Sequence, residues 1–142
     1  MNLREISRLF YQLKLTHQET QAIFEKETGF SLTRYELLMT VNEKGSCLQN
    51  EIQQEMQIDS AAITRQLKIL EEKGYVKRTR NSANNREIFV ELTDSSRAAL
   101  ASCEQDHQQE EQDVLLNLTQ AETKQLLELL AKITPKHNKK ED

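Results

Sequence analysis

The basic side chains that could bind phosphate groups are concentrated in one segment, residues 60–86. This segment carries seven Lys and Arg against two Glu, a balance of +5, in a chain of 142 residues whose net charge is −4. Because salt screens charges beyond about 8–10 Å, a local basic patch can attract phosphates although the rest of the chain sums to −9. Such a patch is typical of nucleic-acid binding, but clustering on a solvated face would give the same pattern.

Within this segment, an apolar residue at every third or fourth position predicts an amphipathic helix over residues 60–73, ended by Gly74. Its other face is small near the beginning and basic further along. Small residues let a helix approach base edges, and long cations or hydroxyls reach bases and phosphates. The candidate contact residues are Ser60, Ala62, Thr64, Arg65 and Lys68. An ordinary surface helix with mixed polar residues is the alternative.

A shorter helix precedes this one, and a hairpin follows it. Residues 48–56 have helical spacing, and a tight turn at 57–58 joins them to the next helix, which predicts a helix-turn-helix. The period then changes to two, so residues 75–80 and 87–92 are predicted to be strands. Asn-rich residues 81–86 form the turn between them. A hairpin directly after a helix-turn-helix is a wing.

Further helices flank this segment on both sides. Apolar spacing, capping residues and glycine stops place them at residues 3–27, 33–45, 93–117 and 119–133. Thr33 with Glu36, and Thr119 with Glu122, have the spacing of capping boxes. The predicted fold class is therefore mainly α with a small β-hairpin wing, a six-helix winged helix-turn-helix.

The apolar terminal helices indicate how the chain is organised. The last helix carries too many leucines for one stripe, and the first is apolar near its beginning, so both should bury against a two-fold partner. We expect one domain over residues 1–142, with a winged helix-turn-helix lobe at 33–93, dimerisation helices at 1–28 and 94–134, and a disordered tail at 135–142.

The sequence DSAAITRQLKILEEKGYVKRTRNSANNREIFVELT, residues 59–93, resembles the MarR family. The segment from recognition helix to wing is that family's strongest signature, and the six-helix order with its closing LTQAETKQLLELL is also similar. The resemblance covers nearly the whole chain. It implies a homodimeric transcription regulator, commonly a repressor, that binds double-stranded DNA at a pseudo-palindromic operator with half-sites about one helical turn apart.

The resemblance also implies roles for single residues. Helix 60–73 would lie in the major groove, with its five candidate residues contacting bases and phosphates. The family's wing usually carries Asp-x-Arg, which corresponds to Asn84, Asn85 and Arg86. Arg86 would enter the minor groove, whose negative potential attracts guanidinium groups, and Asn84 removes the usual ion pair. Arg78 and Arg80 share one strand face and could grip phosphates, although solubility would also explain them.

Regulators of this family usually release DNA when a small ligand, often aromatic, enters a pocket beside the DNA-binding lobe. The residues that could line such a pocket are Phe10, His17, Phe24, Tyr35 and Leu38. Residues of these types are more often simply core.

Other functions have weaker support in the sequence. Cys47, expected in a turn, and Cys103 could make the protein a thiol-based redox-responsive regulator. His107, Glu110 and Glu111 could share a helix face, but a polar helix is the simpler account, and no metal or other cofactor is expected. No catalytic motif is present, so the chain is not expected to be an enzyme. No membrane-length apolar run or secretory signal is present, so a cytoplasmic protein is expected. A winged-helix module that binds only protein remains the other alternative.

Overall fold

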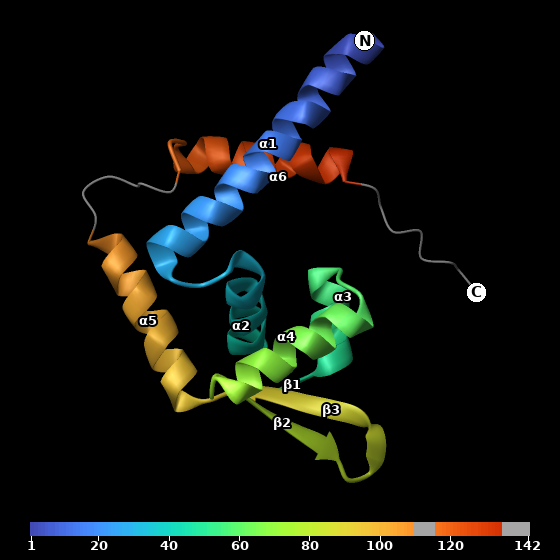
Figure 1. The fold of residues 1–142 in the computed structure, drawn as a ribbon, viewed down its shortest axis with the longest axis vertical. Coiled ribbons are helices and arrows are strands. Elements are labelled where there is room, and N and C mark those ends of the chain that lie inside the picture. Colours follow the sequence, from blue (N-terminus) through green and yellow to red (C-terminus); the bar gives the residue numbers. More distant parts are fainter. Residues whose placement is uncertain (110–115, 135–142) are drawn as a thin grey trace. The chain divides into compact units, whose positions relative to one another are not determined.

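The computed structural model describes residues 1–109 and 116–134, and the chain forms two compact units, 1–110 and 111–142. The first unit contains α1 (Leu3–Thr28), α2 (Leu32–Lys44), β1 (Cys47–Leu48), α3 (Gln49–Met56), α4 (Ser60–Glu72), β2 (Val76–Asn81), β3 (Asn84–Leu92) and α5 (Asp94–Gln108) (Figure 1). The second contains α6 (Gln120–Ile133). The prediction of a six-helix winged fold is confirmed. Among the described helices, none is both long enough and apolar enough to cross a membrane.

The hydrophobic core lies in the winged lobe, where α2, α3 and α4 pack together over the sheet (Figure 1). Ile63, Leu67 and Leu70, the predicted apolar stripe of α4, are at most 1% exposed. The other core residues are Leu37, Leu38, Val41, Cys47, Ile52, Val76, Val90, Leu92 and Leu100. Because one full face of α4 is buried, its opposite face is the one available to a partner.

The sheet has three antiparallel strands in the order β1-β3-β2. Strand β1 was not predicted, because two residues are too few to show alternation; it pairs Cys47 with Val90. The hairpin of β2 and β3, which we call the wing, is longer than predicted. Asn81 pairs with Asn84 beside a register shift, so only two residues form the turn instead of residues 81–86.

Helix α2 begins one residue before the predicted cap. The prediction that Thr33 and Glu36 open this helix is wrong. Ser31 is the N-cap, and its hydroxyl oxygen accepts a hydrogen bond from the backbone N–H of Arg34 (3.3 Å). Serine is a better N-cap than threonine, and Ser31 lies two residues before Thr33.

The turn between α3 and α4 has the geometry of a helix-turn-helix. Gln57 takes a left-handed conformation (φ 55°), and its N–H donates to the carbonyl of Gln53, which ends α3. Asp59 then caps α4, because its carboxylate accepts from the N–H of Ala62 (2.7 Å). The tight turn that the sequence predicted between these two helices is thereby confirmed.

The last part of the chain differs from prediction in length. Helix α5 ends at Gln108, and residues 116 and 117, predicted to be helical, are not. The capping box of α6 is confirmed: Glu122 N–H donates to the Thr119 hydroxyl (3.1 Å), and the Glu122 carboxylate accepts from Thr119 N–H (3.0 Å). These hydrogen bonds lower the pKa of Glu122. The predicted tail at 135–142 lies outside the described residues.

Candidate nucleic-acid interface

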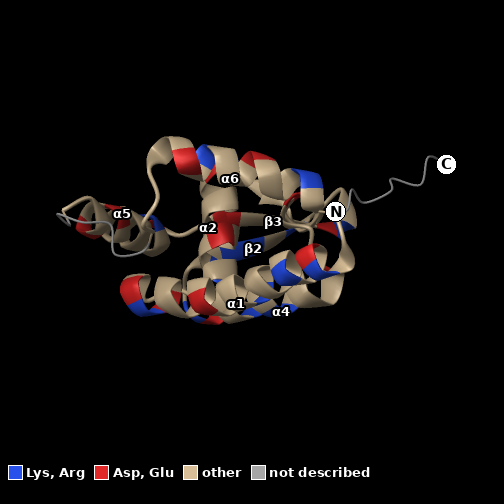
Figure 2. Cartoon of the chain, turned by 90° about the horizontal axis from the view of Figure 1, so that it is seen from above, with Lys and Arg blue, Asp and Glu red and all other residues tan. Residues whose placement is uncertain are grey.

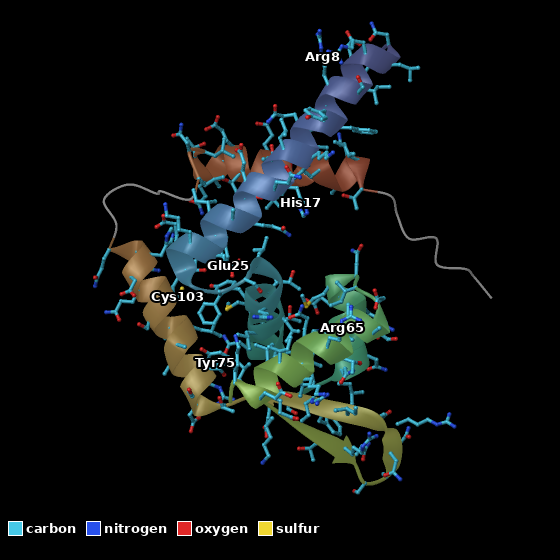
Figure 3. The ribbon with its side chains drawn as sticks, viewed as in Figure 1. Arg8, His17, Glu25, Arg65, Tyr75 and Cys103 are labelled. Carbon is cyan, nitrogen blue, oxygen red and sulfur yellow. The ribbon has the colours of Figure 1, made fainter. Side chains whose placement is uncertain are left out.

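The outward face of α4 presents most of the predicted contact residues to solvent. Ser60, Thr64 and Lys68 recur every four residues and therefore lie on one side of the helix, with Arg65 beside them (Figure 3). These four side chains are exposed, and Ala62 is half-buried. Within the described part of the chain, the charged groups of Arg65 and Lys68 have no hydrogen-bond or ion-pair partner, so both are available for phosphate or base contacts.

Helix α4 is fastened to its neighbours by side-chain hydrogen bonds. Arg34 of α2 donates from Nε to Gln66 Oε1 (3.1 Å). Gln49, the first residue of α3, donates from Nε2 to Thr64 Oγ1 (3.1 Å). Sequence reasoning missed Gln49, because no spacing rule pairs residues that lie fifteen apart across a turn. The outward face of α4, with Ser60, Thr64, Arg65 and Lys68, is therefore held in place from α2 and from α3. We call it the reading face.

Arg78 is engaged within the protein. Its Nε and Nη2 donate to the two carboxylate oxygens of Glu71, both at 3.2 Å. This bidentate pair lowers the pKa of Glu71, chiefly through the hydrogen bond. Alternation places Arg78 on the same strand face as buried Val76, and only 21% of its side chain is exposed. In this structure, Arg78 neutralises a carboxylate and joins the end of α4 to the wing.

The tip of the wing is ordered by hydrogen bonds to its own backbone. Arg80 Nη1 donates to the carbonyl of Asn85 across the hairpin (2.8 Å). Asn84 Oδ1 accepts from the N–H of Arg86 (3.1 Å), so the asparagine at the usual aspartate position orients the main chain of Arg86 and not its guanidinium. Among the described residues nothing pairs with that guanidinium, which is exposed.

The five Lys and Arg residues among the predicted DNA contacts therefore divide into two groups. Figure 2 shows basic residues along α4 and β2. Arg78 and Arg80 stabilise the wing, whereas Arg65, Lys68 and Arg86 have charged groups without a partner in the described chain. The second group can bind an external anion without first breaking a bond inside the protein.

Of the five residues predicted to line a ligand pocket, the structure brings Phe24 and Tyr35 into contact. Leu38 is fully buried in the core, and Phe24 packs edge-on against Tyr35 with ring centroids 5.1 Å apart. Phe10 and His17 are exposed on α1; Figure 3 labels His17. Only Tyr35 borders a larger groove, which lies between α2 and α3, measures about 630 Å³ and is lined by Leu32, Thr33, Tyr35, Glu36, Met39, Thr40, Glu43, Glu55, Met56 and Ile58.

Neither cysteine has the environment of a reactive thiol. Cys47 is 4% exposed in β1 and not in a turn as predicted, and burial raises its pKa. Cys103 is half-buried, its Sγ donates to the carbonyl of Thr28 (3.8 Å), and burial also raises its pKa. Within the described residues no three His, Cys, Asp or Glu side chains form a metal site. The suggested set at His107 includes residues 110 and 111, which lie outside the described residues.

Comparison with known proteins places this architecture in a family. The MarR family model matches residues 30–88. The HTH-type transcriptional regulator YdgJ of Bacillus subtilis is 35% identical over 129 residues, which cover 91% of this chain and 79% of YdgJ.

Two solved structures of regulators on DNA have the same fold. A point mutant of MarR from E. coli, complexed with operator DNA, superposes with a TM-score of 0.80 at 26% identity, covering 95% of this chain and all of that one. The repressor CouR, bound to a 23-mer DNA duplex, has a TM-score of 0.77 at 25% identity and covers 94% and 97%. With its helix-turn-helix, its wing and its exposed cations on both, the chain belongs to the MarR family of DNA-binding transcription regulators.

Proposed function

We propose that this protein is a homodimeric, sequence-specific repressor of transcription that binds a pseudo-palindromic duplex operator. The observation that carries the proposal is the division among its cations. Arg65 and Lys68 on α4 and Arg86 on the wing present unpaired charges, while the neighbouring arginines are occupied inside the lobe. The same fold binds operator DNA in the MarR mutant structure.

The free cations on α4 and the free cation on the wing suit different grooves of B-DNA. The major groove is about 12 Å wide and admits an α-helix, and α4 offers its small residues at the end that would approach the base edges. The minor groove is narrower and attracts arginine, and Arg86 extends from the tip of an ordered hairpin. We therefore assign Ser60, Ala62, Thr64, Arg65 and Lys68 to the major groove and Arg86 to the minor groove.

Homodimerisation is proposed from the apolar surfaces of two helices, each considered by itself. Helix α1 has no buried residue and leaves Leu3, Phe10 and Tyr11 more than half exposed. Helix α6 likewise has no buried residue, and Leu127 is 64% exposed. Contiguous apolar surface of this kind marks a protein–protein interface. Sedimentation at micromolar concentration should give twice the mass of one chain, 33 kDa rather than 16.5 kDa.

A small-molecule effector is proposed for the groove between α2 and α3. Its volume of about 630 Å³ lies in the range of ligand sites. Tyr35, Met39 and Met56 supply apolar and aromatic contacts there. Occupation of the groove would act on α2, to which α4 is tied through Arg34. Release of the protein from DNA by an aromatic compound, and loss of that release in a Met39→Trp variant that fills the groove, would support this assignment.

Footprinting of genomic fragments over a salt series tests the central proposal. Two protected half-sites one helical turn apart, with affinity that falls steeply as salt rises, are expected. Scrambled duplexes of the same length serve as the control and should bind more weakly at every salt concentration. Absence of specific protection under all conditions would contradict DNA recognition and favour a winged helix that binds only protein.

A further inference from the structure

The side chain of Thr64 stands in the middle of the reading face of α4 but has its hydroxyl turned toward the protein. Thr64 Oγ1 donates to the carbonyl of Ser60 one helical turn earlier (2.8 Å). The same oxygen accepts from Gln49 Nε2 of α3 (3.1 Å). Two hydrogen bonds from two elements therefore fix the rotamer of a residue that is nevertheless exposed.

These bonds exhaust what the hydroxyl can donate. A threonine hydroxyl has one proton, and here that proton is held by Ser60. If the Gln49 amide is turned over, its oxygen instead of its nitrogen faces Thr64, and the proton is still taken by the protein. In both arrangements Thr64 has no donor left for an acceptor on a DNA base. The hydroxyl oxygen keeps a lone pair, but its two bonds hold it toward the protein, so the methyl group is the part of the side chain that can face outward.

We infer that Thr64 recognises a thymine through contact between its methyl group and the 5-methyl group of the base. Thymine is the base that presents a methyl group in the major groove, and apolar side-chain atoms recognise it there. Residues near the beginning of a recognition helix are the ones that reach base edges, and Thr64 is the fifth residue of α4. The inference rests on the proposed function, because it requires α4 to lie in the major groove.

The test replaces each thymine of the protected operator, one at a time, by deoxyuridine. This change removes the 5-methyl group and leaves every hydrogen-bonding atom of the base in place. For the wild-type protein we expect one position per half-site at which affinity falls about fourfold, because burial of one methyl-sized group contributes ~0.8 kcal/mol. Affinities are measured by fluorescence anisotropy with full-length protein.

Two substitutions at Thr64 separate its methyl group from its hydroxyl. Thr64→Ser keeps the hydroxyl and lacks the methyl group, so the deoxyuridine effect at that position should disappear. Thr64→Val keeps a methyl group and lacks the hydroxyl, so the effect should persist. Circular dichroism and thermal unfolding confirm that both variants are folded, which they should be because residue 64 is exposed.

The outcomes distinguish this inference from the proposed function. If no operator is protected at all, the proposed function is wrong and the inference is wrong with it. If an operator is protected but no thymine shows the effect, or Thr64→Ser keeps it, only the inference is overturned. Loss of the effect in Thr64→Val but not in Thr64→Ser would show that the hydroxyl reads the base, which also overturns it.

Discussion

Replacing Glu71 by glutamine should strengthen the dependence of DNA binding on salt. In the structure the two carboxylate oxygens of Glu71 accept hydrogen bonds from Nε and Nη2 of Arg78, at 3.2 Å each. The pKa of Glu71 is lowered from its ordinary value of 4.5, so the pair persists throughout the neutral range and mild acidification does not open it. Glu71→Gln removes the charge that holds Arg78 and leaves a basic side chain at the base of the wing without an ionic partner.

The expected change in salt dependence follows from the number of phosphate contacts. Each phosphate neutralised on B-DNA adds about 0.9 to the slope of log K against log salt. If the freed Arg78 contacts one phosphate in each subunit of the proposed dimer, the slope steepens by about 1.8. Between 50 and 200 mM salt, the variant should then lose about twelvefold more affinity than the wild type does. Stability should fall by about 1 kcal/mol, the upper end of what partly exposed ion pairs contribute, since Arg78 is only 21% exposed and its bond to Glu71 is bidentate.

The assay is fluorescence anisotropy with one labelled duplex at four or more salt concentrations. Asp94→Asn is the control for net charge, because it removes one carboxylate from a more exposed ion pair, with Arg97 (3.1 Å), on α5. That control should leave the slope unaltered. An unchanged slope in Glu71→Gln would refute the reasoning and show that Arg78 does not reach phosphate even when it is free. An Arg78→Gln variant whose salt slope is lower than that of the wild type would also refute the reasoning. It would show that wild-type Arg78 already leaves Glu71 when DNA binds.

Three further substitutions or treatments test other parts of the structure. Arg86→Ala should weaken operator binding by about 1–3 kcal/mol in anisotropy titrations. Lys26→Ala, which removes one charge from the end of α1, is the control and should not weaken it. Equal losses in the two variants would mean that Arg86 acts only through net charge. Gln49→Met keeps the side-chain length, removes a buried amide oxygen that has no partner in the described structure, and also removes the hydrogen bond to Thr64. Because these two effects offset one another, unfolding by urea should show stability within about 1 kcal/mol of the wild type; a loss of more than about 2 kcal/mol would disprove that account of the oxygen. Cys47 and Cys103, whose pKa values burial raises, should react with iodoacetamide at pH 7.5 more slowly than free glutathione does, and hydrogen peroxide should not change DNA affinity; rapid modification with loss of binding would support the redox alternative.

The sequence predicted the recognition helix well because its buried stripe is periodic. Ile63, Leu67 and Leu70 could be assigned to the core from their spacing alone, and the outward residues followed from them. Capping residues and the change to period two likewise located the turn and the wing. These features are local, so a few neighbouring residues determine them. Strand β1 escaped prediction because its two residues pair with a strand more than 40 positions later, at Phe89 and Val90.

The roles of single arginines could not be predicted in the same way. Arg78, Arg80 and Arg86 are alike in sequence, with one charge each in the same basic segment. Their partners differ. Arg78 binds a carboxylate at the end of α4 and Arg80 binds a carbonyl across the hairpin. The guanidinium of Arg86 has no partner in the described chain. Which partner a long side chain finds depends on tertiary distances that no spacing rule contains. Helical spacing likewise cannot show which faces of two helices meet, so it could not indicate that Phe24 and Tyr35 pack together while Phe10 and His17 are exposed on α1.

Helix α4 is joined to three different elements along its length. Gln49 holds Thr64 near its beginning, Arg34 holds Gln66 at its middle, and Arg78 holds Glu71 at its end. A helix fixed at three points cannot tilt or slide without breaking at least one of these bonds, so it behaves as a rigid part of its lobe. In the proposed dimer, control of DNA binding would then act by changing the distance between the two copies of α4, and a compound that only loosens surface loops would leave recognition intact.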